Sequence, residues 1–194
     1  MDEYEDKQTG VSLNNAVIRK TIMRKLFLCI ISIFFITAAQ AQKLPCSNPV
    51  YRQFDFWIGE WEAFGPNGKK AGDSKISLIL DSCIIFEEWT SASLQQGLRY
   101  AGKSFNTYNA TTKQWQQTWV DNVGGTNEYL RGKFENNQII YYSTSFKISK
   151  DTMAIRKMTF TNLSADKLRQ HGEISKDNST TWSTEYDLEY RRRK

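Results

Sequence analysis

Residues 97–104, GLRYAGKS, match the phosphate-binding pattern G-x-x-x-x-G-K-[ST] at every fixed position. Such a loop holds nucleotide phosphates only where it leaves a buried strand and enters a helix with free N–H groups. Here the next residues, FNTYNATTKQWQQTWV, alternate aromatic and polar side chains around a turn-like YNATTK, which is the period of a β-hairpin. We therefore expect the match to be coincidental and this segment to begin a strand.

Two adjacent carboxylates, Glu87 and Glu88, offer a second kind of chemistry. They lie on a predicted strand, where successive side chains alternate, so only one of them can point inward. An inward carboxyl beside aromatic rings would have a raised pKa and could act as an acid or a base. The simpler alternative is a structural ion pair with Arg99 or Arg156.

The chain has a single histidine, His171, which excludes a His-rich zinc centre and the two-His metalloprotease pattern. No G-x-S-x-G elbow supports a Ser-His-Asp triad. A lone histidine could still bind haem iron, but alternation places His171 with Arg169 and Glu173 on a face that looks solvated. We therefore expect no metal and no cofactor.

The N-terminal segment has the pattern of a secretory signal. Arg24 and Lys25 precede the apolar run LFLCIISIFFI, and Ala39-Gln40-Ala41 forms an A-x-A cleavage site. Residues 23–41 are thus predicted to be a signal peptide, and residues 1–22 an upstream extension ahead of the true start at Met23. The apolar run is too short for a permanent membrane anchor. The product, residues 42–194, is expected in the periplasm or outside the cell.

Export leaves Cys46 and Cys83 as the remaining cysteines, and an oxidising compartment favours a disulfide between them. The alternative is a buried free thiol at Cys83. The formal net charge of the chain is +5, and its basic residues are scattered except for the terminal RRRK. This distribution predicts no nucleic-acid partner.

Residues 42–194 have the size of one domain and read as a run of strands without a helical period. Regular spacing and tight turns predict an all-β fold, an antiparallel meander closed into a roughly ten-stranded barrel. The predicted strands are 54–64, 73–80, 83–91, 98–107, 113–121, 126–134, 138–147, 153–161, 166–175 and 180–191.

Alternation also predicts what each face carries. One face of strand 113–121 has Trp115, Gln117, Trp119 and Asp121. One face of the last strand has Trp182, Thr184, Tyr186, Leu188 and Tyr190, with Ser183, Glu185, Asp187 and Glu189 opposite. These aromatic faces are either ordinary barrel core or the walls of a ligand cavity.

The segment FDFWIGEWEAFG contains Gly59-Glu60-Trp61, a G-x-W triplet on the first predicted strand. With SCIIFEEW, GKSFNTY, WQQTWVDN and STTWSTEYDLEYRR, it resembles the calycin superfamily of lipocalin-like and fatty-acid-binding-protein-like barrels. Within that superfamily it is similar to a bacterial family of small exported proteins of unsettled function. The resemblance implies that Trp61 closes one end of the barrel and that Arg191, Arg192 or Arg193 packs across its ring.

These observations together predict a secreted barrel that binds a small apolar or aromatic molecule in its interior. Trp89, Trp115 and Trp119 would supply stacking surface, and the candidate polar contacts are Glu88, Arg99, Ser104, Asn106, Gln117, Asp121 and Arg156. One alternative is an isomerase or hydrolase that uses the same cavity. Another is a packed barrel that acts as an interaction module.

Overall fold

The computed structural model describes Lys20, Met23 and residues 45–194. The predicted extension at 1–22 and signal peptide at 23–41 lie outside these described residues, apart from Lys20 and Met23. Residues from 45 onward belong to one compact unit. Within the described residues there is no helix with the length and hydrophobicity of a membrane span.

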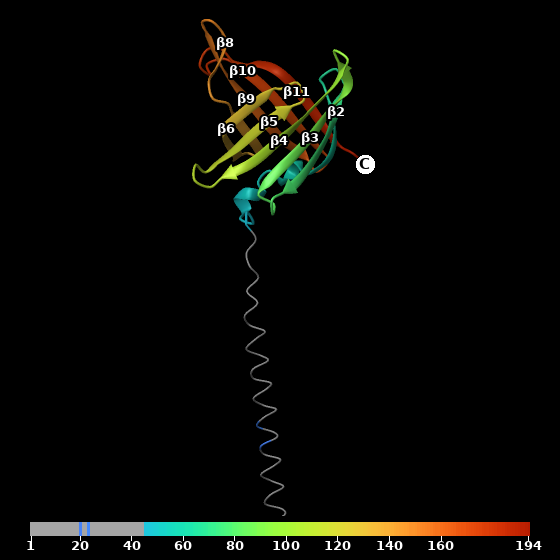
Figure 1. The fold of residues 1–194 in the computed structure, drawn as a ribbon, viewed down its shortest axis with the longest axis vertical. Coiled ribbons are helices and arrows are strands. Elements are labelled where there is room, and N and C mark those ends of the chain that lie inside the picture. The colour runs from blue at the N-terminus through green and yellow to red at the C-terminus, as the bar shows by residue number, and fades with distance from the viewer. Residues whose placement is uncertain (1–19, 21–22, 24–44) are drawn as a thin grey trace, which may run out of the picture. The chain divides into compact units, whose positions relative to one another are not determined.

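The predicted all-β barrel is confirmed: ten antiparallel strands pair in chain order and the last pairs with the first. An eleventh short strand, β8, pairs only with β9 and stands outside the closed ring (Figure 1). The strands are β1 (Gly59–Phe64), β2 (Lys70–Ile79), β3 (Ile84–Gln95), β4 (Leu98–Asn109), β5 (Gln114–Asp121), β6 (Thr126–Glu135), β7 (Gln138–Tyr142), β8 (Phe146–Ser149), β9 (Thr152–Ser164), β10 (Lys167–Ser175) and β11 (Ser183–Arg192).

Residues 98–104 lie in a strand and Gly97 lies in the turn before it, so the segment is not a phosphate-binding loop. Gln96 and Gly97, both with positive φ, make the turn between β3 and β4. Two successive residues with positive φ are typical of a tight β-hairpin turn, in which glycine is favoured. Strand β4 then runs unbroken from Leu98 to Asn109, so no helix N-terminus is present to hold a phosphate.

The prediction of a strand from residue 54 is wrong at its start. Two short 3-10 helices, η1 (Pro49–Arg52) and η2 (Asp55–Trp57), precede β1. A 3-10 turn brings residues three apart onto one face, so Phe54 and Trp57 both point inward and are fully buried. The predicted strand 138–147 also divides, into β7 and β8.

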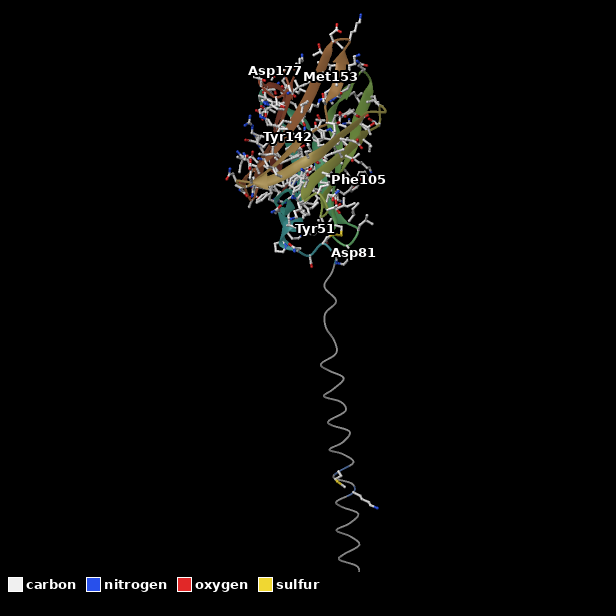
Figure 2. The ribbon with its side chains drawn as sticks, turned by 90° about the vertical axis from the view of Figure 1, so that its left-hand side faces the viewer. Tyr51, Asp81, Phe105, Tyr142, Met153 and Asp177 are labelled. Carbon is white, nitrogen blue, oxygen red and sulfur yellow. A yellow bond between two sulfur atoms is a disulfide. The ribbon has the colours of Figure 1, made fainter. Side chains whose placement is uncertain are left out.

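The two short helices close one end of the barrel, opposite β8 (Figure 1). Phe54 stacks on Trp57 with ring centroids 5.0 Å apart, and both contact Phe160 on β9. Trp115 and Tyr141 complete this aromatic plug. Figure 2 shows Tyr51 and Asp81 at this end and Met153 and Asp177 at the other.

The predicted disulfide between Cys46 and Cys83 is present. It ties the segment before η1 to the turn between β2 and β3, at the plugged end of the barrel. It therefore fastens the two short helices to the barrel whose end they close.

The first and last barrel strands meet at a cation and an aromatic ring. Trp61 on β1 pairs in register with Arg192 on β11, and the Arg192 guanidinium carbon lies 4.2 Å from the indole centroid. Arg192 also donates from Nη1 to the carbonyl of Ile58 and from Nε to that of Ala165. Gly59 has a φ of +133°, and an added Cβ there would overlap the guanidinium.

Arg192 thus packs across the Trp61 ring, as the resemblance to calycins implied for an arginine of the last strand. Trp61 in turn donates from Nε1 to the carbonyl of Trp57 at 2.7 Å. One indole thus links η2, β1 and, through Arg192, β11 and the turn before β10.

We expect removal of the disulfide in Cys46→Ala/Cys83→Ala to lower the free energy of unfolding. The bond joins residues 37 apart, and closing such a loop stabilises a fold by about 3–4 kcal/mol in the chain-entropy model. Denaturant unfolding of the double variant, and of the parent with and without reductant, measures the effect. Equal midpoints for all three samples would contradict the prediction.

We expect Arg192→Ala to lower the free energy of unfolding by about 2–3 kcal/mol, because it removes the contact with Trp61 and leaves two carbonyls without their donor. Arg191→Ala is the matched control, since the Arg191 side chain lies on the outer face over Phe64 and beside Glu189. Its loss is expected to be under about 1 kcal/mol. Denaturant unfolding of both variants tests this, and equal losses would argue against a special role for Arg192.

Candidate functional site

A cavity of about 370 Å³ occupies the barrel interior. Arg156, one of its lining residues, packs over Phe146 of β8, which places this part of the cavity toward the end opposite η2. The lining comes from seven of the ring strands. Its residues are Glu87, Trp89, Tyr100, Gln117, Trp119, Asn127, Tyr129, Arg156, Met158, Gln170, Glu185, Tyr186, Leu188 and Tyr190.

The inward carboxylate of β3 is Glu87 and not Glu88. Glu87 is 3% exposed, and each of its carboxylate oxygens accepts a hydrogen bond of 2.8 Å, one from Ser74 Oγ and one from Ser104 Oγ. Glu88 is exposed on the outer face and pairs with Lys103 at 3.1 Å. The expectation that Glu88 contributes to the cavity is therefore wrong, because strand alternation places the two carboxylates on opposite faces.

Burial raises the pKa of the Glu87 carboxyl to about 7, and the two serine hydroxyls act in the opposite direction. The ion pair considered for an inward glutamate does not form: neither Arg99 nor Arg156 reaches Glu87. Its only hydrogen-bond partners in the described part of the chain are neutral hydroxyls.

A chain of buried donors ends at this carboxyl. Tyr141 Oη and Gln117 Nε2 both donate to Asn106 Oδ1, at 3.1 and 3.0 Å. Asn106 Nδ2 donates to Ser104 Oγ at 3.0 Å, which leaves the Ser104 hydroxyl proton for Glu87. Because every bond points the same way, the chain favours negative charge on Glu87.

Six of the fourteen side chains that line the cavity are aromatic. Trp119 Nε1 donates to Tyr100 Oη and to Asp121 Oδ2, and Tyr100 Oη donates to the same carboxylate oxygen. Gly102 lies directly beneath the Trp119 indole, where a Cβ would overlap the ring. The indole therefore packs flat against the neighbouring strand and leaves the interior open.

The mouth of the cavity carries an ion pair. Arg156 donates from Nε and Nη2 to the two oxygens of Glu185, at 2.8 and 3.2 Å, and from Nη1 to Asn127 at 3.1 Å. The charge of Arg156 is thus balanced by Glu185. Burial raises the pKa of Tyr129, also on the cavity wall, to about 12.

The predicted faces of the last strand are only partly correct. A bulge skips Glu185 in the pairing of β11 with β10, so that Glu185 lines the cavity next to Tyr186. Such a bulge reverses the alternation on one side of it. Thr184 consequently contacts His171 on the outer face, and Trp182 packs outside against Tyr142 and Lys157.

The other predicted site residues divide into three groups. Trp89, Gln117, Trp119 and Arg156 line the cavity. Ser104, Asn106 and Asp121 hold the lining side chains by hydrogen bonds.

Trp115 and Arg99 lie elsewhere. Trp115 belongs to the aromatic plug and donates to Gln53. Arg99 binds the carbonyls of Ser91 and Ala92.

The lone histidine is not part of the cavity. His171 Nε2 lies 2.9 Å from Thr184 Oγ1, and its Nδ1 lies 3.6 Å from Glu173, on the outer face that alternation predicted. Its side chain therefore does not point at a group bound inside the barrel. Among the described residues, no three His, Cys, Asp or Glu side chains gather as a metal site.

The predicted set lacks several residues that line the cavity, and strand alternation in the sequence could have identified some of them. Continuing the alternation from Asn106 and Ser104 back along β4 leads to Gly102 and Tyr100. Alternation along β3 likewise places Glu87 on the same face as Trp89. The inward position of Glu185 could not be predicted in this way, because no sequence pattern indicates the bulge that turns it inward.

No protein-family model matches the chain, and no curated protein matches it. The assignment of the fold therefore depends on the closed ten-stranded barrel itself.

We expect the stability of the protein to fall between about pH 4.5 and 7 because of Glu87. In this range the folded state keeps the proton, since its pKa is about 7, whereas the unfolded state has lost it near 4.5. The folded state then binds more protons, so the free energy of unfolding declines as pH rises, by roughly 3 kcal/mol in total from this group. Glu87→Gln should remove this component.

Chemical unfolding of the parent and of Glu87→Gln at several pH values measures the difference. Glu88→Gln serves as the matched control, because its carboxyl is exposed on the outer face. Parallel profiles for the parent and Glu87→Gln would contradict the assignment of a buried carboxyl at position 87.

Proposed function

We propose that this protein is an exported, calycin-like barrel that binds a small, largely apolar or aromatic molecule in its interior. The observation that carries the proposal is the cavity, in which eight of the fourteen lining side chains are aromatic or aliphatic and the other six are polar. Small-molecule sites have this composition, and their volumes are about 300–1,000 Å³. At about 370 Å³ the cavity suits a single small ligand.

Two further features support the proposal. The disulfide between Cys46 and Cys83 suits an oxidising compartment, as expected after export. The first-strand tryptophan beneath an arginine of the last strand is the arrangement implied by the resemblance to calycins.

The cavity beside Glu87 supports an interior binding site over the alternative of a barrel filled throughout by side chains. An isomerase or hydrolase is a second candidate function, and Glu87 favours it. A carboxyl with a pKa of about 7 in a cavity wall is suited to accept and return a proton near neutral pH. Such an enzyme would lose turnover in Glu87→Gln and keep it in Glu88→Gln.

We expect the protein to bind N-phenyl-1-naphthylamine, a neutral aromatic probe whose fluorescence rises in apolar surroundings. Trp119→Ala should weaken binding about tenfold, because loss of aromatic stacking costs about 1.4 kcal/mol. Trp182→Ala is the matched control, since this indole packs on the outside of the barrel.

Fluorescence titration of the three proteins measures the affinities. Absence of binding by the parent, or equal weakening in both variants, would contradict binding in the cavity.

A further inference from the structure

The cavity wall contains a carboxylate without a counter-charge. Among the described residues Glu87 forms no ion pair, and the two groups that bind it are serine hydroxyls. Arg156 is the cation of the cavity lining, and both of its carboxylate contacts are with Glu185. An ionised Glu87 would therefore give the cavity a net charge of about −1.

The charged and titratable groups around Glu87 are few. On the strands beside it, Lys75 of β2 and Lys103 of β4 are exposed on the outer face, next to Glu88. From within the barrel, Tyr100, Tyr186 and Tyr190 face it, with the Arg156–Glu185 pair at the mouth.

The three tyrosines remain neutral near neutral pH. Burial raises the pKa of each phenol, and the negative charge of Glu87 raises it further. They therefore present uncharged rings and hydroxyl groups to the cavity.

The hydrogen bonds around Glu87 favour its ionised form, yet no cationic side chain among the described residues pairs with it. The donor chain from Tyr141 and Gln117 through Asn106 ends at Ser104, whose hydroxyl donates to one carboxylate oxygen of Glu87. Ser74 donates to the other oxygen. A carboxylate oxygen has lone pairs beyond the single hydrogen bond that each one accepts here. Burial opposes ionisation of the carboxyl, and a cation nearby would offset this effect.

The surrounding rings suit a cation. The centroids of Trp89 and Tyr190 lie 6.2 Å apart, and those of Tyr100 and Trp119 lie 6.3 Å apart. The electron-rich faces of indole and phenol rings attract ammonium groups, most strongly where water is excluded.

We propose that the ligand of this cavity is an organic cation, an amine or quaternary ammonium with an apolar body, whose charge lies against the carboxylate of Glu87 among these rings. The inference rests on the proposed function, since it names the chemical class of the molecule that the cavity binds.

Binding of such a cation should depend on pH. Below neutral pH Glu87 holds a proton in the free protein, and the cation binds the ionised form, so each binding event releases one proton. The affinity should rise about tenfold for each pH unit up to neutrality and then become constant. Glu87→Gln should abolish this dependence.

Isothermal titration calorimetry with two matched probes tests the proposal. They are 2-phenylethylammonium and 2-phenylethanol, which share their size and ring and differ in charge. At pH 8 we expect the parent protein to bind the ammonium at least tenfold more tightly than the alcohol. Glu87→Gln should lose this preference and still bind the alcohol, and Glu88→Gln should behave as the parent.

Equal or tighter binding of the alcohol by the parent protein would overturn the proposal without recourse to any variant. An unchanged affinity of folded Glu87→Gln for the ammonium would also overturn it. If neither probe binds while N-phenyl-1-naphthylamine does, the cation inference fails and the proposed function stands. If none of the three binds, both fail.

Discussion

The barrel depends on the contact between its first and last strands. Arg192 lies over the Trp61 indole and at the same time binds the carbonyl groups of Ile58 and Ala165. Gly59 is required beneath it, because any side chain there would occupy the position of the guanidinium. Trp61 in turn fixes η2 through the carbonyl of Trp57. The same set of contacts therefore closes the ring of strands and holds η2 at its end.

This arrangement divides the interior into two parts. The end beneath η2 is filled by aromatic rings, among them Phe54, Trp57 and Phe160, which stabilise the fold by burial. The remaining part keeps its rings against the walls, as Trp119 does over Gly102, and leaves a cavity. The donor chain that begins at Tyr141, within the plug, ends at Glu87 in the cavity. A side chain of the packed end therefore influences the ionisation of Glu87 in the cavity.

Much of this fold could be predicted from the sequence, because period-two alternation and turn residues determine strands locally. The disulfide was predictable from the count of cysteines. The aromatic residues at 54–57 fit a strand as well as a short 3-10 turn, so the sequence alone does not distinguish the two. Alternation groups Glu87, and not Glu88, with Trp89, so the inward carboxylate of this pair could be predicted from the sequence. The inward turn of Glu185 depends on a bulge set by long-range pairing, which no local pattern reveals.

The most direct test of the account is the ionisation of Glu87 itself. Its carboxyl ¹³C chemical shift can be followed by NMR across the pH range, with Glu87→Gln used for assignment, in the absence and presence of 2-phenylethylammonium. The account predicts a titration midpoint near 7 in the free protein, which moves to lower pH when the cation is present. A midpoint near the ordinary glutamate value of 4.5, unchanged by the cation, would contradict it.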